Sequence, residues 1–290
     1  ARFWYSLKMA GDSERLMAPR TPLRSSVLPS VERFAGFADT YDEYRPAAPD
    51  VLGDILCRYA KTATPSLVVD IGCGTGVSTR HWADRAGRVI GVDPSAEMLE
   101  KAKERTGAGN VHYVAGLGER TGLAGGLADI VVYSNCLHWM EPEPTLAEGV
   151  RLLRTGGVFA AFYHDQYPMT SAWEADRMYR ALRERAIFLD AERGITASAR
   201  KWDRADHQPR MQASGCFRHL RELSVHHVEE GNAERLIGLA MSDGFVRGLM
   251  KAGVGEDELG LSRFRSEASG ILGEKPQPWF WTISLWIGVA

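Results

Sequence analysis

The sequence predicts an α/β fold built around a mostly parallel sheet, and three observations support this. Residues 67–71 hold four apolar side chains (Leu67, Val68, Val69 and Ile71), which is typical of a strand buried on both faces. Glycines follow at positions 72, 74 and 76, and a helical segment is predicted over 77–86. A second apolar run, Arg88–Asp93, comes next. Strands that alternate with helices in this way favour parallel pairing.

The glycine turn predicts a ligand site at the end of the first strand. Glycine accepts positive φ and lets the backbone approach a ligand closely. The spacing of Gly72, Gly74 and Gly76 is one residue short of the dinucleotide fingerprint. Asp70 would repel a pyrophosphate but would suit an ammonium group, and Asp93 lies where an acidic residue contacts ribose hydroxyls. S-adenosylmethionine (SAM) has both groups and no phosphate; an α/β domain that binds NAD or no ligand is the alternative.

Two motifs carry a family resemblance. Residues 69–76 read Val-Asp-Ile-Gly-Cys-Gly-Thr-Gly, and residues 91–99 read Gly-Val-Asp-Pro-Ser-Ala-Glu-Met-Leu. The pair resembles the class I SAM-dependent methyltransferases, in particular the small-molecule branch (methyltransferase type 11) with trans-aconitate methyltransferase-like proteins. The resemblance implies a Rossmann-like, seven-stranded, mostly parallel sheet with an antiparallel last strand and helices on both faces. It also implies a helical cap inserted after strand five.

Composition and charge narrow the function classes. The chain has 290 residues and a net charge of −2, which provides no global field for nucleic acid or membrane surfaces. Its four cysteines are far apart, so we expect neither a metal site nor a disulfide framework, and we expect a cytoplasmic location. No apolar run reaches the roughly 20 residues of a membrane span, and no signal peptide is expected.

Four segments make up the expected domain organisation. We expect residues 1–33 to form a mobile or loosely docked N-terminal arm and residues 34–165 to form the SAM-binding core. We expect residues 166–221 to form a helical cap that shapes the substrate pocket, and residues 222–290 to complete the sheet. Within the last segment, we expect strand 279–289 to insert antiparallel between the fifth and sixth strands, as in the resembled family.

The first helical stripe is expected to lie near the cofactor. Phe34, Phe37, Tyr41 and Tyr44 recur at helical spacing, and a further helix is predicted over 49–61. In the resembled family such a segment covers the cofactor, and a tyrosine and an arginine approach its methionine carboxylate. Tyr41 and Arg45 match these by residue type. The alternative is a packed amphipathic helix that ends at Pro46.

The next elements are expected to hold the adenine. A helix is predicted over 96–105, with Met98 against the adenine or in the core, and a strand over 110–114. Related sequences place an aspartate where this chain has Leu117. The adenine amine would therefore rely on the backbone of Leu117 and Gly118 or on Glu119. The full expected cofactor set follows: Tyr41, Arg45, Asp70, Gly72, Cys73, Gly74, Asp93, Pro94, Met98, Leu117, Gly118, Glu119, Ser134 and Asn135.

Strands over 128–134 and 157–162 are predicted to end beside the reacting methyl group, because ligands of open α/β sheets bind beyond the carboxyl ends of the strands. Strand 128–134 ends at Ser134 and is followed by Asn135 and His138. Strand 157–162 is followed by Tyr163 and His164. His138, His164 and Tyr163 are the candidate catalytic residues, and structural or turn roles are the alternatives. The helix between these strands, 144–153, is expected to end at a glycine C-cap within 154–157.

The second half of the chain follows the family pattern less closely. A long helix is predicted over 169–189, with its apolar face at Trp173, Met178, Ala181, Leu182 and Ile187. The cation-rich segment 193–221 would suit an anionic substrate such as a carboxylate, or would form a solvated surface. A strand is predicted over 222–229, and helices over 233–241, 244–251 and 257–272.

The predicted function is SAM-dependent methyl transfer to a small-molecule acceptor through an oxygen, nitrogen or carbon nucleophile. A carboxylate or a natural-product intermediate is a possible acceptor. The displacement needs alignment and water exclusion but no metal. Two alternatives remain: a SAM-binding enzyme that catalyses a cyclisation or rearrangement, and a nucleic-acid methyltransferase, against which the near-neutral charge argues. The sequence predicts neither the acceptor atom nor the oligomeric state.

Overall fold

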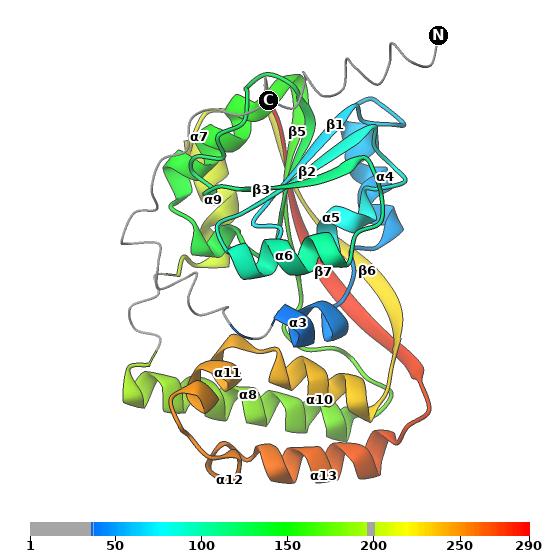
Figure 1. The fold of residues 1–290 in the computed structure, drawn as a ribbon, viewed down its shortest axis with the longest axis vertical. Helices are drawn as coiled ribbons and strands as arrows, with labels where there is room; N and C mark the ends of the chain where they lie inside the picture. The colour runs from blue at the N-terminus through cyan, green and yellow to red at the C-terminus, as the bar shows by residue number, and fades with distance from the viewer. Residues whose placement is uncertain (1–35, 37, 196–200) are drawn as a thin grey trace.

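The fold places a sheet with its helices at one end and a layer of helices at the other (Figure 1). The computed structural model describes residue 36 and residues 38–195 and 201–290. The predicted arm 1–33 and the apolar residues Phe34 and Phe37 lie outside the described residues. Among those described, no helix is long and apolar enough to cross a membrane.

Seven strands form one sheet in the order β3-β2-β1-β4-β5-β7-β6. The parallel part contains β1 (Leu67–Ile71), β2 (Arg88–Asp93), β3 (Val111–Ala115), β4 (Ala128–Ser134) and β5 (Leu153–His164). The long strand β7 (Gln277–Val289) runs antiparallel between β5 and β6 (His219–Gly231). The predicted seven-stranded sheet and the predicted insertion of the last strand are therefore confirmed.

The register brings the carboxyl ends of the parallel strands to one edge of the sheet. Ile71 at the end of β1 pairs with Val92 of β2, and Ser134 at the end of β4 pairs with Phe162 of β5. Polar residues that follow different strands therefore meet at this edge, which is where open α/β sheets bind ligands.

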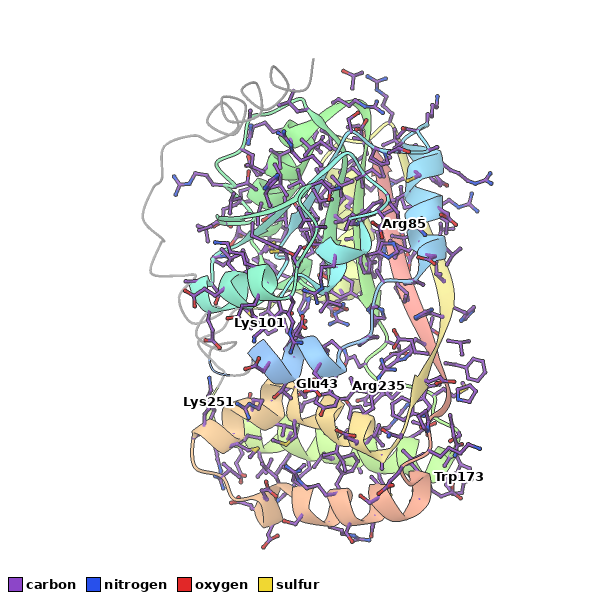
Figure 2. All side chains as sticks on the ribbon, turned by 45° about the vertical axis from the view of Figure 1, so that its right-hand side comes forward. Glu43, Arg85, Lys101, Trp173, Arg235 and Lys251 are labelled. Carbon is purple, nitrogen blue, oxygen red and sulfur yellow. The ribbon has the colours of Figure 1, made fainter. Side chains whose placement is uncertain are left out.

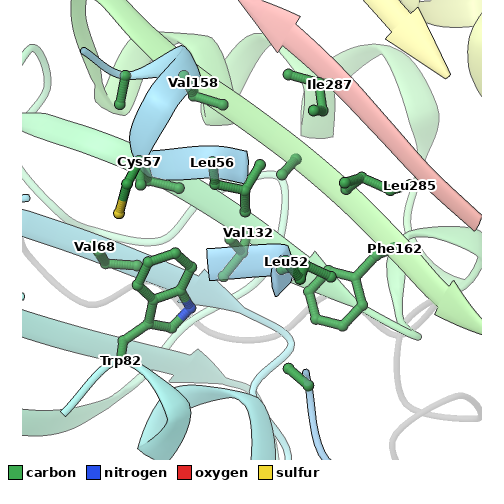
Figure 3. Close-up of a cluster of buried hydrophobic side chains, with 14 of the residues drawn as sticks. Leu52, Leu56, Cys57, Val68, Trp82, Val132, Val158, Phe162, Leu285 and Ile287 are labelled. Atoms are coloured by element: carbon green, nitrogen blue, oxygen red, sulfur yellow. The ribbon is translucent and has the colours of Figure 1, made fainter. Parts of the chain in front are cut away.

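Alternating side chains of the strands build two cores, one on each face of the sheet. On one face Val132 and Phe162 pack with Leu52 and Leu56 of α4 (Asp50–Tyr59) and with Trp82 (Figure 3). On the other face, side chains of the same two strands pack together in a second cluster that includes Leu146 and Leu152 of α7 (Pro142–Leu152). Helices α5 (Val77–His81), α6 (Ala96–Glu104) and α9 (His207–Ala213) complete this end of the molecule.

A third apolar cluster holds the helical layer together. Its helices are α8 (Trp173–Arg193), α10 (Ala233–Met241), α11 (Gly244–Lys251), α12 (Glu256–Leu259) and α13 (Leu261–Leu272). The short helix α3 (Ala38–Tyr44) lies between this layer and α6 (Figure 1). Four of the layer's helices come from the segment 222–290, and α10 and α11 have the bounds that the sequence predicted for them.

Several local predictions were wrong. Helix α7 runs directly into β5 with no glycine C-cap, and Gly156 (φ 73°) lies within the strand instead. The helix predicted over 257–272 is broken at Gly260, whose φ of 79° cannot continue a helix. The segment after residue 200 contains the short 3₁₀ helix Arg204–Asp206 (η2) and helix α9, neither of which was predicted.

Helix α8 buries a different face from the predicted one. Trp173, predicted to face the core, is 66% exposed, and Ile187 is 37% exposed. The buried stripe contains Ala175, Tyr179, Leu182, Ala186 and Leu189. Only Leu182 was placed correctly as a fully buried residue. Small alanines and a tyrosine make this stripe look less apolar in the sequence than the solvent-facing positions.

Candidate active site

A cavity of about 530 Å³ lies at the carboxyl edge of the sheet. Its walls come from the loops after β1, β2, β4 and β5, from α3, and from α8, α10 and α11 of the helical layer. The site is therefore built between the two parts of the molecule and closed by α3.

The glycine loop after β1 forms one wall of the cavity. Gly74 has a φ of 54°, and a Cβ atom added there would meet no described atom within 4 Å. Its N–H donates to Asp93 Oδ2 at 2.9 Å, and the N–H of Ser95 donates to Asp93 Oδ1 at 2.9 Å. The loop backbone thus fixes the carboxylate at the end of β2 while remaining open to a ligand.

Two carboxylates lie at this loop: Asp70 is fully buried beneath it, and Asp93 is partly buried in the cavity wall. Asp70 accepts a hydrogen bond from Thr79 Oγ1 at 2.6 Å, whereas its Oδ1 has no partner among the described residues. Burial raises the pKa of Asp70 to about 7, with a further contribution from the charge of Asp93. Burial also raises the pKa of Asp93 to about 6. A cation bound beside them would offset both effects.

Met98 and residues 117–119 line the far end of the cavity. Met98 is buried at the start of α6, where its N–H donates to Ser95 Oγ. Leu117 is also buried, and its N–H and C=O both pair with Arg120 across a turn. Gly118 lies against Met140, so a side chain at position 118 would collide with the Met140 thioether. The backbone of Gly118 and the side chain of Glu119 thus remain as polar groups at this end.

Helix α3 covers the cavity with Tyr41 and Arg45. The Arg45 guanidinium lies over the Tyr41 ring, 5.0 Å from its centroid, and Nη2 donates to the Ser242 carbonyl at 2.7 Å. Asp42, on the same helix, accepts from Arg80 Nη2 at 2.6 Å, and Arg80 Nη1 donates to the Thr75 carbonyl at 2.6 Å. The helix is therefore tied both to the helical layer and to the glycine loop.

Asn135 and His164 join the ends of β4 and β5. Asn135 takes a left-handed φ of 54°, and its Oδ1 accepts from the His164 N–H at 3.0 Å. His164 Nε2 lies 3.0 Å from the Ala47 carbonyl and must donate to it. Its Nδ1, 3.2 Å from Asn135 Nδ2, then accepts. Burial lowers the pKa of His164 to about 4, so the ring is neutral and both nitrogens are engaged.

Tyr163 lies behind the cavity wall, not in it. Its hydroxyl accepts from the His138 N–H at 2.9 Å and lies 3.0 Å from His207 Nε2. Burial lowers the pKa of His207 to about 4, so its imidazole is neutral where it meets the tyrosine hydroxyl. Burial raises the pKa of Tyr163 well above its ordinary value. His138 itself is buried, lines the cavity and packs against Tyr163.

Thirteen of the fourteen residues expected to bind the cofactor line this one cavity. The exception is Asp70, which is fully buried beneath the glycine loop. Of the candidate catalytic residues, His138 and His164 line the cavity and Tyr163 does not.

Several further residues of the cavity wall were not among the predicted site residues, and they come from the helical layer and from two other segments. They are Tyr179, Arg183, Asp243 and Phe245 from α8 and the α10–α11 junction, with Lys201, Trp202 and Arg204 from the segment after residue 200, and Trp281 from β7. Arg183 Nε donates to Asp243 Oδ2 at 2.8 Å. The cation-rich segment was a signal for Lys201 and Arg204. Nothing in the pattern marked Arg183, because the buried face of α8 was misplaced.

Comparison with known proteins places this geometry in a family. A family model described as a methyltransferase domain matches residues 69–161. A malonyl-[acyl-carrier protein] O-methyltransferase of Enterobacter lignolyticus is 32% identical over 181 residues, which cover 59% of this chain and 69% of that protein. The chain belongs to the class I SAM-dependent methyltransferases. SAM is the cofactor of this family.

The alignments with other curated relatives cover fewer residues of this chain. A malonyl-[acyl-carrier protein] O-methyltransferase of Serratia marcescens is 34% identical over 126 residues, 43% of this chain and 48% of that protein. The chain spans about half the length of the first curated relatives it matches. A solved structure described as a type II methyltransferase from Anaeromyxobacter dehalogenans has the same fold, with a TM-score of 0.60 at 21% identity, over 85% of this chain and 98% of that one.

The residues of the cavity fit SAM. Asp70, beneath the cavity, has an Oδ1 with no partner among the described residues, and burial raises the pKa values of Asp70 and Asp93; a positively charged ammonium or sulfonium nearby would favour the ionised form of both carboxylates. Asp93 uses one lone pair of each oxygen for the backbone, so it can still accept from two hydroxyl groups. The open space over Gly74 admits a ligand against the backbone.

Proposed function

We propose that this protein transfers the methyl group of SAM to a small-molecule acceptor bound under the helical layer. The observation that carries the proposal is the shared cavity. It runs from the glycine loop and Asp93 to the ends of β4 and β5 and on to the helical layer. One end offers groups that suit a nucleoside and an ammonium, and the other offers aromatic and cationic side chains for a second ligand.

Cofactor binding is assigned to the sheet end of the cavity. Asp93 would accept hydrogen bonds from the ribose hydroxyls, and Asp70 would stabilise the ammonium from beneath the glycine loop. Arg45, with Tyr41 under its guanidinium, would face the methionine carboxylate. Met98 would pack on the adenine, and Gly118 and Glu119 would contact its edge. Each assignment except that of Asp70 rests on the position of the residue in the cavity wall, and that of Asp70 rests on its burial beneath the glycine loop.

The acceptor end is assigned a positioning role. The bound cofactor supplies an electrophilic methyl group on a sulfonium, so the chain mainly has to align the acceptor and exclude water. Trp139, Trp202, Phe245 and Trp281 supply apolar walls for this purpose. A carboxylate acceptor would need no base, whereas a hydroxyl or an amine acceptor would.

His138 is the best placed of the candidate catalytic residues. His164 uses both ring nitrogens in the structure, and the Tyr163 hydroxyl is held between the His138 N–H and His207. These contacts disfavour a proton-transfer role for His164 and Tyr163, and we assign both to positioning. A cytoplasmic location, expected from the cysteine pattern, stays a prediction.

Turnover of labelled SAM tests the proposal. The wild-type protein, incubated with methyl-labelled SAM and a panel of small acids, alcohols and amines, should form S-adenosylhomocysteine and a labelled product. His138→Ala should slow transfer at least tenfold and leave S-adenosylhomocysteine affinity within about twofold, because general-base and orienting groups typically contribute 10²–10⁴-fold.

Two results would change this assignment. Equal turnover in wild type and His138→Ala would make His138 structural. Tight cofactor binding with conversion of the acceptor but no methyl loss from SAM would favour the cyclisation or rearrangement alternative.

A further inference from the structure

Arg204 lies where the active-site cavity meets a second cavity. The second cavity has a volume of about 470 Å³ and is lined by Thr282, Ser284 and Trp286 of β7 among others. Both cavities share His164, Asp165, Gln166 and Arg204 as wall residues. Arg204 is therefore a wall residue of both cavities.

The Arg204 guanidinium is held in a fixed plane. It stacks on the Tyr163 ring, 4.2 Å from the centroid. The ring is itself held in place, because the Tyr163 hydroxyl accepts from the His138 N–H and is hydrogen-bonded to His207 Nε2. The segment that carries Arg204 is also tied to the site, because the Trp202 N–H donates to the His138 carbonyl at 2.8 Å. A stacked guanidinium presents its N–H edge in one direction, ready to bind a planar anion.

Arg204 has a partly buried charge that forms no ion pair with a described residue. Among the described residues its buried Nε has no hydrogen-bond partner, and no carboxylate lies within 4.0 Å of the guanidinium. Arg183 differs, because Asp243 neutralises it. Burial lowers the pKa of Arg204, and the charges of Arg183 and Arg45 also lower it, whereas Tyr163 and the more distant Asp165 offset only part of this effect. Buried charges in proteins are normally paired, so this arrangement calls for an anion from outside the chain.

We propose that the methyl acceptor carries an oxyanion group, a carboxylate or a phosphate, and that Arg204 is the residue that binds it. This inference rests on the proposed function, because it names the class of acceptor for that site. The fork of N–H donors on a guanidinium matches the two oxygens of a carboxylate or a phosphate. Arg204 lies beside Tyr163 and His138 at the ends of β5 and β4, and therefore next to the expected transfer point.

The competing occupant is the carboxylate of the cofactor itself. Arg45 is the residue assigned to that group, because it directly follows α3, lies against Tyr41, and has a buried Nε with no hydrogen-bond partner among the described residues. The two assignments predict different effects of a substitution at position 204. If Arg204 binds the acceptor, the substitution should lower the affinity for the acceptor and leave the affinity for the cofactor unchanged.

A titration of the protein saturated with S-adenosylhomocysteine tests the inference. Trp139, Trp202 and Trp281 line the cavity, so intrinsic fluorescence reports binding there. The probes are succinate, methylphosphonate and the neutral analogue succinamide. Wild type should give a saturable signal with at least one anion and none with succinamide. The responding anion distinguishes a carboxylate acceptor from a phosphate acceptor.

Variants at position 204 locate the effect. Arg204→Gln should lower the affinity for the anion about 10- to 100-fold, the range expected for the loss of a charge-assisted hydrogen bond. Arg204→Lys should recover part of the loss, because it keeps the charge but not the fork. Arg218→Gln is the matched control, since Arg218 belongs to the same cation-rich segment but is exposed and lines neither cavity.

Three outcomes would overturn the inference. In the first, the neutral and the anionic probes bind with equal affinity. In the second, the anion affinity of Arg204→Gln is within twofold of that of Arg218→Gln. In the third, Arg204→Gln lowers the affinity for S-adenosylhomocysteine tenfold or more. The last result would assign Arg204 to the cofactor. Failure of wild type to bind S-adenosylhomocysteine at all would instead refute the proposed function, so the two failures are distinguishable.

Discussion

At the residue scale, the site depends on two aspartates, one buried beneath the glycine loop and one partly buried in the cavity wall. Asp70 is fully buried at the end of β1, and Asp93 lies at the end of β2 under two backbone N–H donors. The hydrogen bonds favour the ionised forms, but burial outweighs them and raises both pKa values. The pair is therefore poised to respond to a positively charged ligand.

The sign of this effect on stability follows from linkage. The folded-state pKa of Asp70, about 7, is higher than the value of about 3.9 expected in the unfolded chain. The folded protein without ligand holds this proton more strongly, so it loses stability as pH rises between these two values. A bound ammonium favours the ionised carboxylates, so ligand affinity should change in the opposite direction and rise with pH.

Asp70 thus predicts a pH dependence of cofactor binding. Calorimetric affinity for S-adenosylhomocysteine should fall several-fold as the pH is lowered from 7.5 to 6.5, because Asp70 takes up a proton in that range. In Asp70→Asn the affinity should be weaker at pH 7.5 and nearly constant over the same interval. A variant that kept the wild-type slope would show that another group controls binding.

At the element scale, α3 is the closing element of the cavity. Its Tyr44 ring packs against the backbone of Gly238 in α10, so closely that a Cβ at position 238 would collide with the ring. Asp39 pairs with Lys101 of α6 at 2.5 Å, and Figure 2 shows Lys101 on the α6 side, facing α3. Asp42 pairs with Arg80 at 2.6 Å and with Arg105 at 3.6 Å. Polar contacts on two sides thus hold a helix of only seven residues.

The two aspartates of α3 should differ in importance. The Asp42 side chain is 8% exposed, and its partner Arg80 also contacts the glycine loop, whereas the Asp39 side chain is 75% exposed. Asp42→Asn should speed S-adenosylhomocysteine dissociation about 5- to 30-fold, since a charged hydrogen bond of this kind contributes about 1–2 kcal/mol. Asp39→Asn should change it less than threefold, because exposed ion pairs contribute about 0–1 kcal/mol. Stopped-flow displacement measures both rates; equal rates would show that α3 does not hold the ligand.

At the scale of the whole molecule, the sheet and the bounds of helices α10 and α11 were predictable, but the assembly of the helices into a layer was not. The strands show strong apolar runs, and the glycine loop and Asp93 mark their ends, so the bounds of β2 and β4 were predicted correctly. The resemblance supplied the position of β7, which local periodicity does not contain. The helical layer depends on contacts between α8 and helices some 40 to 100 residues later in the chain, and these leave no local pattern.

The site divides in the same way. Residues carried by motifs at strand ends, such as Asp93 and Asn135, could be placed in the cavity from the sequence. Arg183 and Asp243 could not, because their ion pair joins two helices that meet only in the folded molecule. His207, the partner of Tyr163, was missed because α9 was not predicted.

Cofactor binding through Asp93 is the claim on which the account depends, and calorimetric titration with S-adenosylhomocysteine tests it most directly. Wild type should bind it and should not bind NADH. Asp93→Ala should weaken binding about 10- to 150-fold, which corresponds to about 1.5–3 kcal/mol for a charge-assisted contact. Asp257→Ala, at an exposed position on α12, should bind like wild type. Absence of binding in wild type, or unchanged affinity in a folded Asp93→Ala variant, would contradict the account.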